Sequence, residues 1–344
     1  MLATNNWLAQ VCHVNNVIKA VWCCGKGLVA LLAVVWMGCG GNADPENSGD
    51  GSTGNDAGNE GKLKVTATVN MVGDLARQVG GEHVVVTELM GPGVDPHLYK
   101  ATQGDLVKLQ KADIVFYVGL HLEGKIQDTL EKMDKQAGKS TVAVSKTIDH
   151  KKLLRDPGAV EFPDPHIWFD VLLWLQTVDA MVEGLSQADP KHKADYEKNG
   201  ATTKAGMQKL HEWAAARITE LPVEKRILVT SHDAYNYFGN QYGFKVVGLQ
   251  GISTVGEAGL ADLTKLVDFI KQQKVKAIFV ENSVSPDAIK RIATDAGVVV
   301  GGELFSDAMG ERGKMEGATG AQYDVGTYEG MIRHNINTIV DALK

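Results

Sequence analysis

The chain has 344 residues, of which 44% are hydrophobic, and its formal net charge is −7 at pH 7. This length and composition allow about two domains with sizeable cores, and the negative charge argues against nucleic acid as a partner. The four cysteines all lie within the first 39 residues, at Cys12, Cys23, Cys24 and Cys39. Disulfides, thiol nucleophiles and sulfur-ligated metals are therefore excluded from the rest of the chain.

The N-terminal region reads as an export signal. Two lysines precede the apolar run "GLVALLAVVWMGCGG", whose apolar core of about a dozen residues matches a signal-peptide h-region and is short for a membrane span. The run ends at Gly38 and Cys39, which resembles the site where bacterial lipoproteins are cleaved and lipidated. We predict a signal peptide over residues 1–38 and a lipid anchor on Cys39, which would hold the protein outside the cytoplasm, in the periplasm or at the cell surface. An ordinary signal peptide or a buried helix is the alternative.

Residues 39–61 are rich in Gly, Asn, Ser and Asp and contain no aromatic or branched apolar residue. Such a segment cannot bury apolar surface, so we predict a disordered tether. A Gly-rich coil of this length spans roughly 25 Å, which would keep the globular body close to the membrane without entering it.

From residue 62 onward, short apolar runs alternate with amphipathic stretches. Strands are predicted at 64–69, 83–90, 113–119 and 141–145, and again at 226–231, 245–251, 276–281 and 297–302. Helices are predicted at 73–81, 102–112, 124–133, 234–242, 255–273 and 286–296, and a long one at about 191–220. Alternating strands and helices indicate parallel sheets covered on both faces. We therefore predict an α/β protein with an N-terminal lobe over 62–189, a linking helix over 190–221 and a C-terminal lobe over 222–344.

Three polar residues lie just beyond predicted strands. His97 follows the strand at 83–90 through a Gly-Pro-Gly loop, His232 follows "RILVTS", and Asp307 follows "GVVVGG". In open α/β sheets ligands bind at this carboxyl edge. His166 lies instead at the entrance of a helical run near Trp168.

The tripeptide Asp-Pro-His occurs twice, ending at His97 and at His166. Proline fixes its own φ and restricts the residue before it, so each histidine is presented on a stiff loop. Both loops belong to the first predicted lobe, and together they can bring two imidazoles to one ion. His232 and Asp307 from the second lobe would complete a set of three nitrogens and one carboxylate, which suits a borderline divalent transition metal.

Several separated motifs resemble the metal-binding solute receptors of bacterial ABC transporters for zinc, manganese or iron, the TroA-like group. They are "DPHLYKAT", "GLHLEGK", "DPHIWFD", "SHDAYNYFGNQYG", "ENSVSP" and "GGELFSDAMG". The resemblance covers about residues 62–344. It implies metal ligation by His97, His166, His232 and Asp307 in a cleft between two lobes bridged by a rigid helix. It also implies delivery of the ion to an ABC permease and its ATPase.

The remaining histidines and nearby acids have structural interpretations. His121 also follows a strand, but the family pattern makes it structural. We interpret Glu281 and Glu303 as residues that contact the metal ligands from outside or that lie at strand ends, and not as ligands themselves. We interpret the other histidines as surface or packing residues, namely His83, His150, His192, His211 and His334.

We therefore predict a receptor that captures one divalent metal ion, without enzymatic activity, and that acts as a monomer touching the membrane only through its lipid. Zinc is expected to bind most tightly, with manganese or iron as alternative cargo. A zinc-dependent hydrolase and a surface adhesin are the rival interpretations. Because imidazole must be neutral to ligate, affinity is expected to fall below about pH 6.

Overall fold

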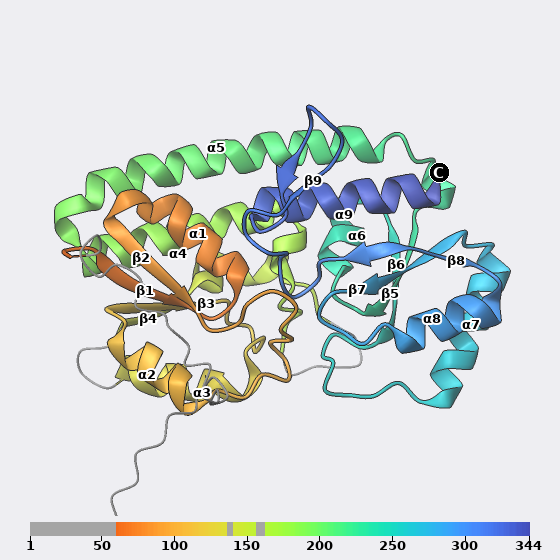
Figure 1. Ribbon diagram of the computed structural model, residues 1–344, viewed down its shortest axis with the longest axis horizontal. Helices are drawn as coiled ribbons and strands as arrows, with labels where there is room; N and C mark the ends of the chain where they lie inside the picture. The colour runs from red at the N-terminus through yellow and green to blue at the C-terminus, as the bar shows by residue number, and fades with distance from the viewer. Residues whose placement is uncertain (1–59, 136–139, 156–161) are drawn as a thin grey trace, which may run out of the picture. The chain divides into compact units, whose positions relative to one another are not determined.

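The computed structural model describes residues 60–135, 140–155 and 162–344, all within one compact unit (Figure 1). The predicted signal peptide, nearly all of the predicted tether, and Cys39 lie outside the described residues. Within the described ranges, no helix is both long enough and apolar enough to span a bilayer.

The first lobe contains a parallel sheet of four strands in the order β2-β1-β3-β4. All four residues of β3, Ile-Val-Phe-Tyr, are buried, as expected for a strand covered on both faces. The strands are β1 Leu63–Ala67, β2 Val84–Glu88, β3 Ile114–Tyr117 and β4 Ser140–Ala143. The helices are α1 Asn70–Gly80, η2 Gly81–His83, α2 Gln103–Lys111, α3 Gly124–Lys135, η3 Val144–Thr147 and η4 His150–Lys152.

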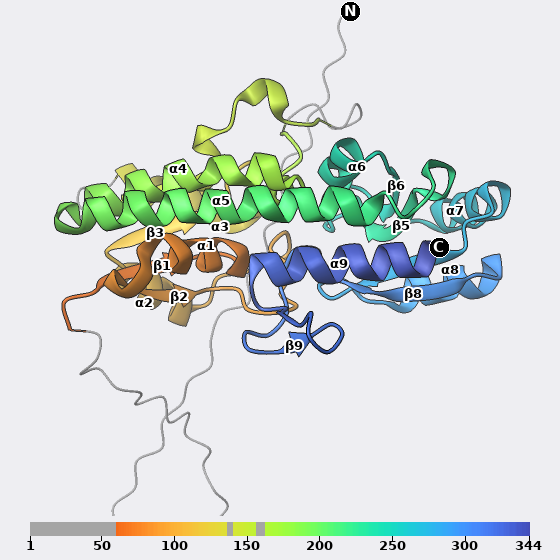
Figure 2. The ribbon, with the colours of Figure 1, turned by 90° about the horizontal axis from the view of Figure 1, so that it is seen from above.

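The first lobe ends with η5 Ile167–Phe169 and α4 Val171–Ala188, and η6 Pro190–His192 and α5 Lys193–Ile218 connect it to the second lobe. Asp170 begins α4, because its side chain accepts hydrogen bonds from the backbone N–H groups of Leu172 and Leu173. Pro190 separates α4 from α5. The 26-residue α5 packs against α4 and α1 of the first lobe and against α9 of the second (Figure 2).

The second lobe contains two parallel strand pairs, β5 with β6 and β7 with β8, and β5 lies beside β7. The strands are β5 Ile227–His232, β6 Lys245–Gln250, β7 Ala277–Glu281 and β8 Val299–Leu304, with a hairpin of β9 Met315–Glu316 and β10 Tyr323–Asp324. The helices are η7 Val223–Lys225, α6 Asn236–Tyr242, α7 Leu260–Gln273, α8 Asp287–Ala296 and α9 Tyr328–Leu343.

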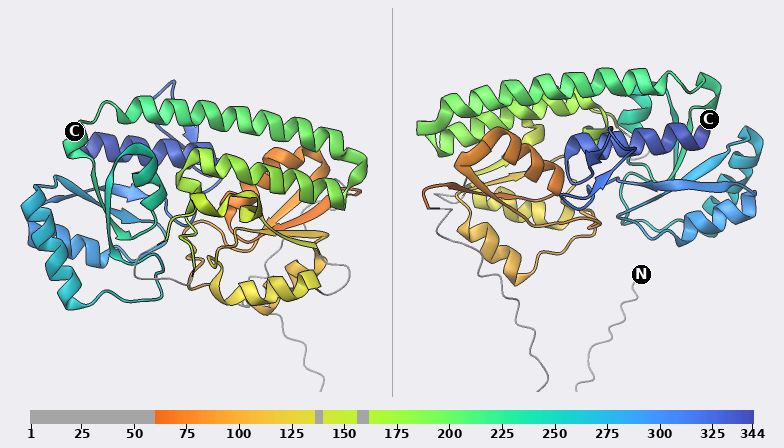
Figure 3. Two further views of the ribbon diagram at one scale, coloured as in Figure 1. Left: turned by 180° about the vertical axis from the view of Figure 1, so that it is seen from behind. Right: turned by 45° about the horizontal axis from the view of Figure 1, so that its top comes forward.

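One apolar core runs through both lobes. It extends from the first sheet through α4 and α5 to α9, and a smaller cluster lies between α7, α8 and the second sheet. In both views of Figure 3, the green helix α5 runs along both lobes, next to the blue helix α9. The lobes are thus packed on common helices and are not merely tethered to each other.

The predicted fold class, two α/β lobes joined by one long helix, is confirmed; the domain boundaries remain a prediction. Three local predictions were wrong or incomplete. Helix α7 begins at Leu260 and not at residue 255, because Gly259 precedes it and donates its N–H to the Asp262 carboxylate, 3.2 Å away. Helix α4 begins after a separate 3-10 turn that follows His166. Helix α9 and the hairpin were not predicted.

Candidate metal centre

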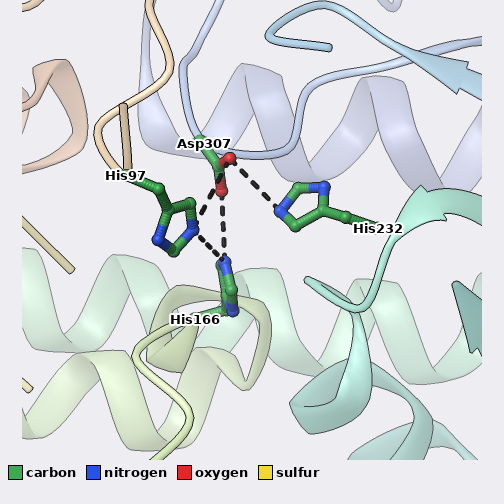
Figure 4. A group of neighbouring side chains, drawn as sticks. All are labelled: His97, His166, His232 and Asp307. Atoms are coloured by element: carbon green, nitrogen blue, oxygen red, sulfur yellow. Dashed lines mark hydrogen bonds and ion pairs between the residues drawn. The ribbon is translucent and has the colours of Figure 1, made fainter. Parts of the chain in front are cut away.

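The structure brings His97, His166, His232 and Asp307 together. Each offers one ligand atom, these atoms lie within 4.8 Å of one another, and all four residues are buried. The His97 and His166 Nε2 atoms are 3.2 Å apart. Asp307 places Oδ1 3.3 Å from His166 Nε2 and Oδ2 3.2 Å from His232 Nε2 (Figure 4). The four side chains thus converge on a single point.

Each of these residues is placed by the end of a secondary-structure element. His232 is the last residue of β5, paired with Gln250, and so lies one position earlier relative to its strand than predicted. Asp307 follows β8 after two further residues. His97 comes after a turn in which Val94 N–H donates to the Gly91 carbonyl, 3.3 Å away. His166 directly precedes η5. The two lobes therefore contribute two residues each.

Buried carboxylates hold the outer nitrogens of two imidazoles. Asp164 Oδ1 is 2.8 Å from His166 Nδ1 and also accepts the His166 backbone N–H at 3.0 Å. Glu281 Oε2 is 2.6 Å from His232 Nδ1, and its Oε1 accepts the backbone N–H groups of Ser231 and His232. When either ring is neutral, its carboxylate favours the tautomer with the proton on Nδ1, which leaves Nε2 facing the centre as a potential ligand atom.

His97 is held differently. Asp95 Oδ1 accepts the backbone N–H of His97 at 2.8 Å, while Asp95 Oδ2 accepts the hydroxyl of Thr254, in the second lobe, at 2.6 Å. In the part of the chain that the structure describes, no carboxylate contacts His97 Nδ1. Asp95 therefore fixes the backbone of His97 and leaves its ring without an acidic partner on the outer side.

The surroundings shift the pKa values of these histidines in opposite directions. Burial lowers the pKa of His97 to about 3. Burial also acts against the charged form of His166, but Asp164 and Asp307 outweigh it and raise the pKa of His166 to about 9. Glu281 and Asp307 likewise outweigh burial and raise the pKa of His232 well above 6.5. These shifts favour the charged forms of His166 and His232 and the neutral form of His97 at pH 7.

The carboxyl of Asp307 is the negative group shared by these cations. Burial would raise its pKa, but His232 and His166 outweigh that effect and keep the pKa of Asp307 well below 3.8. Its carboxylate therefore stays ionised over the physiological range and remains available to a metal ion.

The residues interpreted as structural lie outside the four-residue group. His121 is exposed and stacks on Phe162, with ring centroids 4.1 Å apart. Glu303 is exposed, and its backbone carbonyl is 2.9 Å from His334 Nε2. His83 stacks on His192 with centroids 3.8 Å apart. Among the described residues, no second group of three or more His, Cys, Asp or Glu side chains comes together in this way.

Two contacts were not predicted from the sequence: Asp164 with the His166 ring, and Asp95 with Thr254. A signal for the first existed, since an Asp side chain readily accepts the backbone N–H two residues further along, which places it beside the His side chain in Asp-Pro-His. No local signal predicts the second, because Thr254 is 159 residues from Asp95 in the sequence.

A family model described as ZnuA, the periplasmic component A of the zinc-uptake complex, matches residues 65–342. The chain belongs to this family. The manganese-binding lipoprotein MntA of Bacillus subtilis (strain 168) is 49% identical over 288 residues, covering 82% of this chain and 90% of MntA. The zinc-binding protein TroA of Treponema pallidum (strain Nichols) is 43% identical over 293 residues, covering 84% of this chain and 91% of TroA.

A solved structure of the periplasmic zinc-binding protein TroA from Treponema pallidum has a TM-score of 0.77 and 40% identity, covering 82% of this chain and 99% of that chain. The family predicted from the motifs is therefore confirmed. ZnuA family members are components of uptake systems and are not classed as enzymes. The site of this member is of a kind that can hold one divalent ion.

Proposed function

We propose that this protein captures a divalent transition metal ion, zinc or manganese, outside the cytoplasm and delivers it to the permease and ATPase of an ABC importer. The observation that carries the proposal is the buried cluster of His97, His166, His232 and Asp307. Three imidazole nitrogens and one carboxylate oxygen match the preferences of borderline divalent ions. The family relationship supports the transport role.

The same geometry argues against the rival enzyme. A catalytic zinc site keeps an open coordination position for water or substrate, whereas four protein ligands close the shell. The nearest acids, Asp164 and Glu281, are engaged by histidine ring and backbone N–H groups. They are therefore placed to orient ligands, and neither faces a free coordination position as a general base. An adhesin role gives no reason for the buried cluster.

For the metal, we propose that zinc binds more tightly than manganese in vitro, because nitrogen-rich sites favour zinc over manganese. The relatives support both ions as cargo, since MntA is named for manganese and TroA for zinc. Iron stays a third candidate. Competition binding in the native protein and in His232→Glu tests this choice. The variant supplies a second hard oxygen, so its preference should shift toward manganese.

The location and assembly are also part of the proposal. We propose that Cys39 carries the lipid, that this anchor is the protein's sole attachment to the membrane, and that the protein is a monomer. Radiolabelled fatty-acid incorporation into the native chain and into Cys39→Ser, with membrane fractionation, tests the anchor. Incorporation that persists in Cys39→Ser would contradict it.

The decisive test of the proposed site is calorimetric zinc titration of the native protein, the four single Ala variants and His121→Ala as a matched control. We expect one ion per chain, large losses for His97, His166, His232 and Asp307, and no loss for His121. Equal losses for His121→Ala and His166→Ala would mean that the ligand set is wrong. Hydrolysis of generic ester or peptide substrates by the zinc-loaded protein would favour the enzyme instead.

A further inference from the structure

The side of the centre next to His97 differs from the others in exposure. The His97 side chain is 4% exposed, whereas the side chains of His166, His232 and Asp307 are 0% exposed. Leu98, the next residue, is 51% exposed. Of the four side chains, His97 is therefore the one that reaches solvent.

The opposite side of the centre is closed by buried hydrogen bonds between the lobes. Trp168 Nε1 donates to the Ser306 carbonyl at 3.0 Å, which ties the segment after His166 to the residue before Asp307. Tyr237, on α6, donates its hydroxyl to the Asp164 carbonyl at 2.9 Å. His166 and Asp307 are therefore locked together across the lobes.

The segment after Asp307 has a second attachment. Asn70, on α1, accepts the Met309 backbone N–H at 3.0 Å and donates to the Met309 carbonyl at 3.3 Å. Both side-chain groups of Asn70 are used, and the residue is 3% exposed. Asp307 can thus move away from the first lobe only if buried bonds break, which disfavours this side as the exit.

The loop that carries His97 has a much lighter connection to the second lobe. Thr254 Oγ1 donates to Asp95 Oδ2 at 2.6 Å. Among the described residues, and leaving aside the four candidate ligands, this is the one side-chain hydrogen bond between the His97 loop and the second lobe. Thr254 is 6% exposed, but its neighbour Val255 is 65% exposed. A Cβ placed on Gly251 or Gly256 would meet no atom within 4 Å. The segment around Thr254 is therefore lightly packed.

We propose that Thr254 is the latch of the metal entrance, a positioning residue that controls the rate of metal exchange. This inference rests on the proposed function. When its hydroxyl is bonded to Asp95, Thr254 holds the backbone of His97 toward the other three residues. When that one bond opens, the His97 loop and the Thr254 segment separate and expose the ion, while the buried bonds on the far side stay intact. This short bond, 2.6 Å between Thr254 Oγ1 and Asp95 Oδ2, has to break before the two segments can separate.

The test uses the full chain with Thr254→Val, which keeps the shape of the side chain and removes its hydroxyl. Thr254→Ser restores the hydroxyl, and Ser253→Ala is a matched control in the same segment, where the Ser253 Oγ accepts the Val255 N–H at 3.3 Å. Zinc release into excess chelator and zinc uptake are followed by stopped flow. Loss of this hydrogen bond should accelerate release by roughly two- to tenfold.

Uptake should accelerate along with release in Thr254→Val, so that the dissociation constant changes less than either rate, and both control variants should behave like the native protein. Faster release with slower uptake would overturn the latch. It would mean that Thr254 stabilises the metal-bound geometry and does not control the rate of opening. Unchanged release from a folded variant would overturn it as well. If the native protein takes up no zinc or manganese at all, the proposed function fails, and the latch fails with it.

Discussion

The two Asp-Pro-His tripeptides form the same turn in two different surroundings. In each, the Asp accepts the backbone N–H of the His two residues later, and its second oxygen reaches the other lobe. Asp164 Oδ2 accepts from Asn236 at 3.1 Å, and Asp95 Oδ2 accepts from Thr254 at 2.6 Å. Only Asp164 also binds the ring of its histidine. The tripeptide thus sets the backbone, while tertiary packing decides what happens to the imidazole.

The partners explain the difference. Asn236 belongs to helix α6, whose next residue, Tyr237, also binds the Asp164 carbonyl, so this side is fixed by buried contacts. Thr254 lies in an irregular segment beside exposed Val255. One copy of the motif therefore holds an imidazole with an acidic partner on Nδ1, and the other holds an imidazole without one; under the proposed latch, the second is the one that can be withdrawn.

Removing the imidazoles tests this asymmetry with the largest effect. We expect His166→Ala to weaken zinc binding by more than about 100-fold. Loss of only the residue that hydrogen-bonds to a metal ligand already weakens affinity by up to about 100-fold, and loss of the ligand itself should cost more. His97→Ala should lose less, because its ring is less oriented before binding. Competition with a calibrated chelator measures both. A larger loss for His97→Ala would reverse the comparison.

The histidines of the two Asp-Pro-His tripeptides, His97 and His166, also differ in protonation. A pKa of about 9 keeps His166 protonated at pH 7, and the raised pKa of His232 does the same, whereas His97, at about 3, is already neutral. A metal ion must displace the protons that are present, so affinity should rise with pH at least until the pKa of His166, about 9, is reached. The rise should be about 100-fold per unit of pH where two protons leave.

The pH range in which metal affinity falls therefore lies higher than the value of about 6 expected from the sequence, because the neighbouring carboxylates stabilise the imidazolium forms. Calorimetry at pH 7 in buffers of different ionisation enthalpy should count close to two protons released per ion. A count of three would mean that His97 is also charged, and a count of zero would contradict the whole assignment.

A smaller effect separates the two aspartates. Asp164→Asn should weaken zinc binding by about 10–100-fold, because an outer carboxylate orients its imidazole and raises its basicity. Asp95→Asn keeps an oxygen for the His97 N–H and should change equilibrium affinity little. Titration of both variants under identical conditions provides the measurement. Matching losses would show that Asp95 also acts on its ring.

The smallest expected effect belongs to His121, which follows a strand as His97 does. His121→Ala should leave zinc affinity unchanged within error, because its exposed ring stacks on Phe162 and lies outside the four-residue group. Thermal unfolding checks that the variant is folded. Reduced affinity in a folded protein would extend the site toward this loop.

The sequence allowed prediction of the α/β alternation and of the four residues that the structure gathers. The α/β alternation is confirmed, and the four residues could be picked out because strand ends and Asp-Pro-His are local patterns, supported by family motifs. Their role as metal ligands stays a proposal. The roles of Asp164 and Thr254 depend on which groups of the second lobe pack against each turn. Helix α9 was missed, although Ile336, Ile339 and Val340 are buried on its inner face. Nothing within the stretch 328–343 indicates that it packs against α5.

Helix α5 sets a limit on the shape changes available to the protein. Its 26 residues make a rod of about 39 Å that packs against helices of both lobes, beside a core that they share. A wide hinge motion would have to bend this rod or split that core. The lobes are therefore not expected to open and close by a wide hinge motion when the ion binds. Small-angle X-ray scattering should give nearly the same radius of gyration with and without the metal ion. Because the overall shape would scarcely change, a permease that distinguishes the loaded from the unloaded receptor would have to recognise a different arrangement of its surface loops.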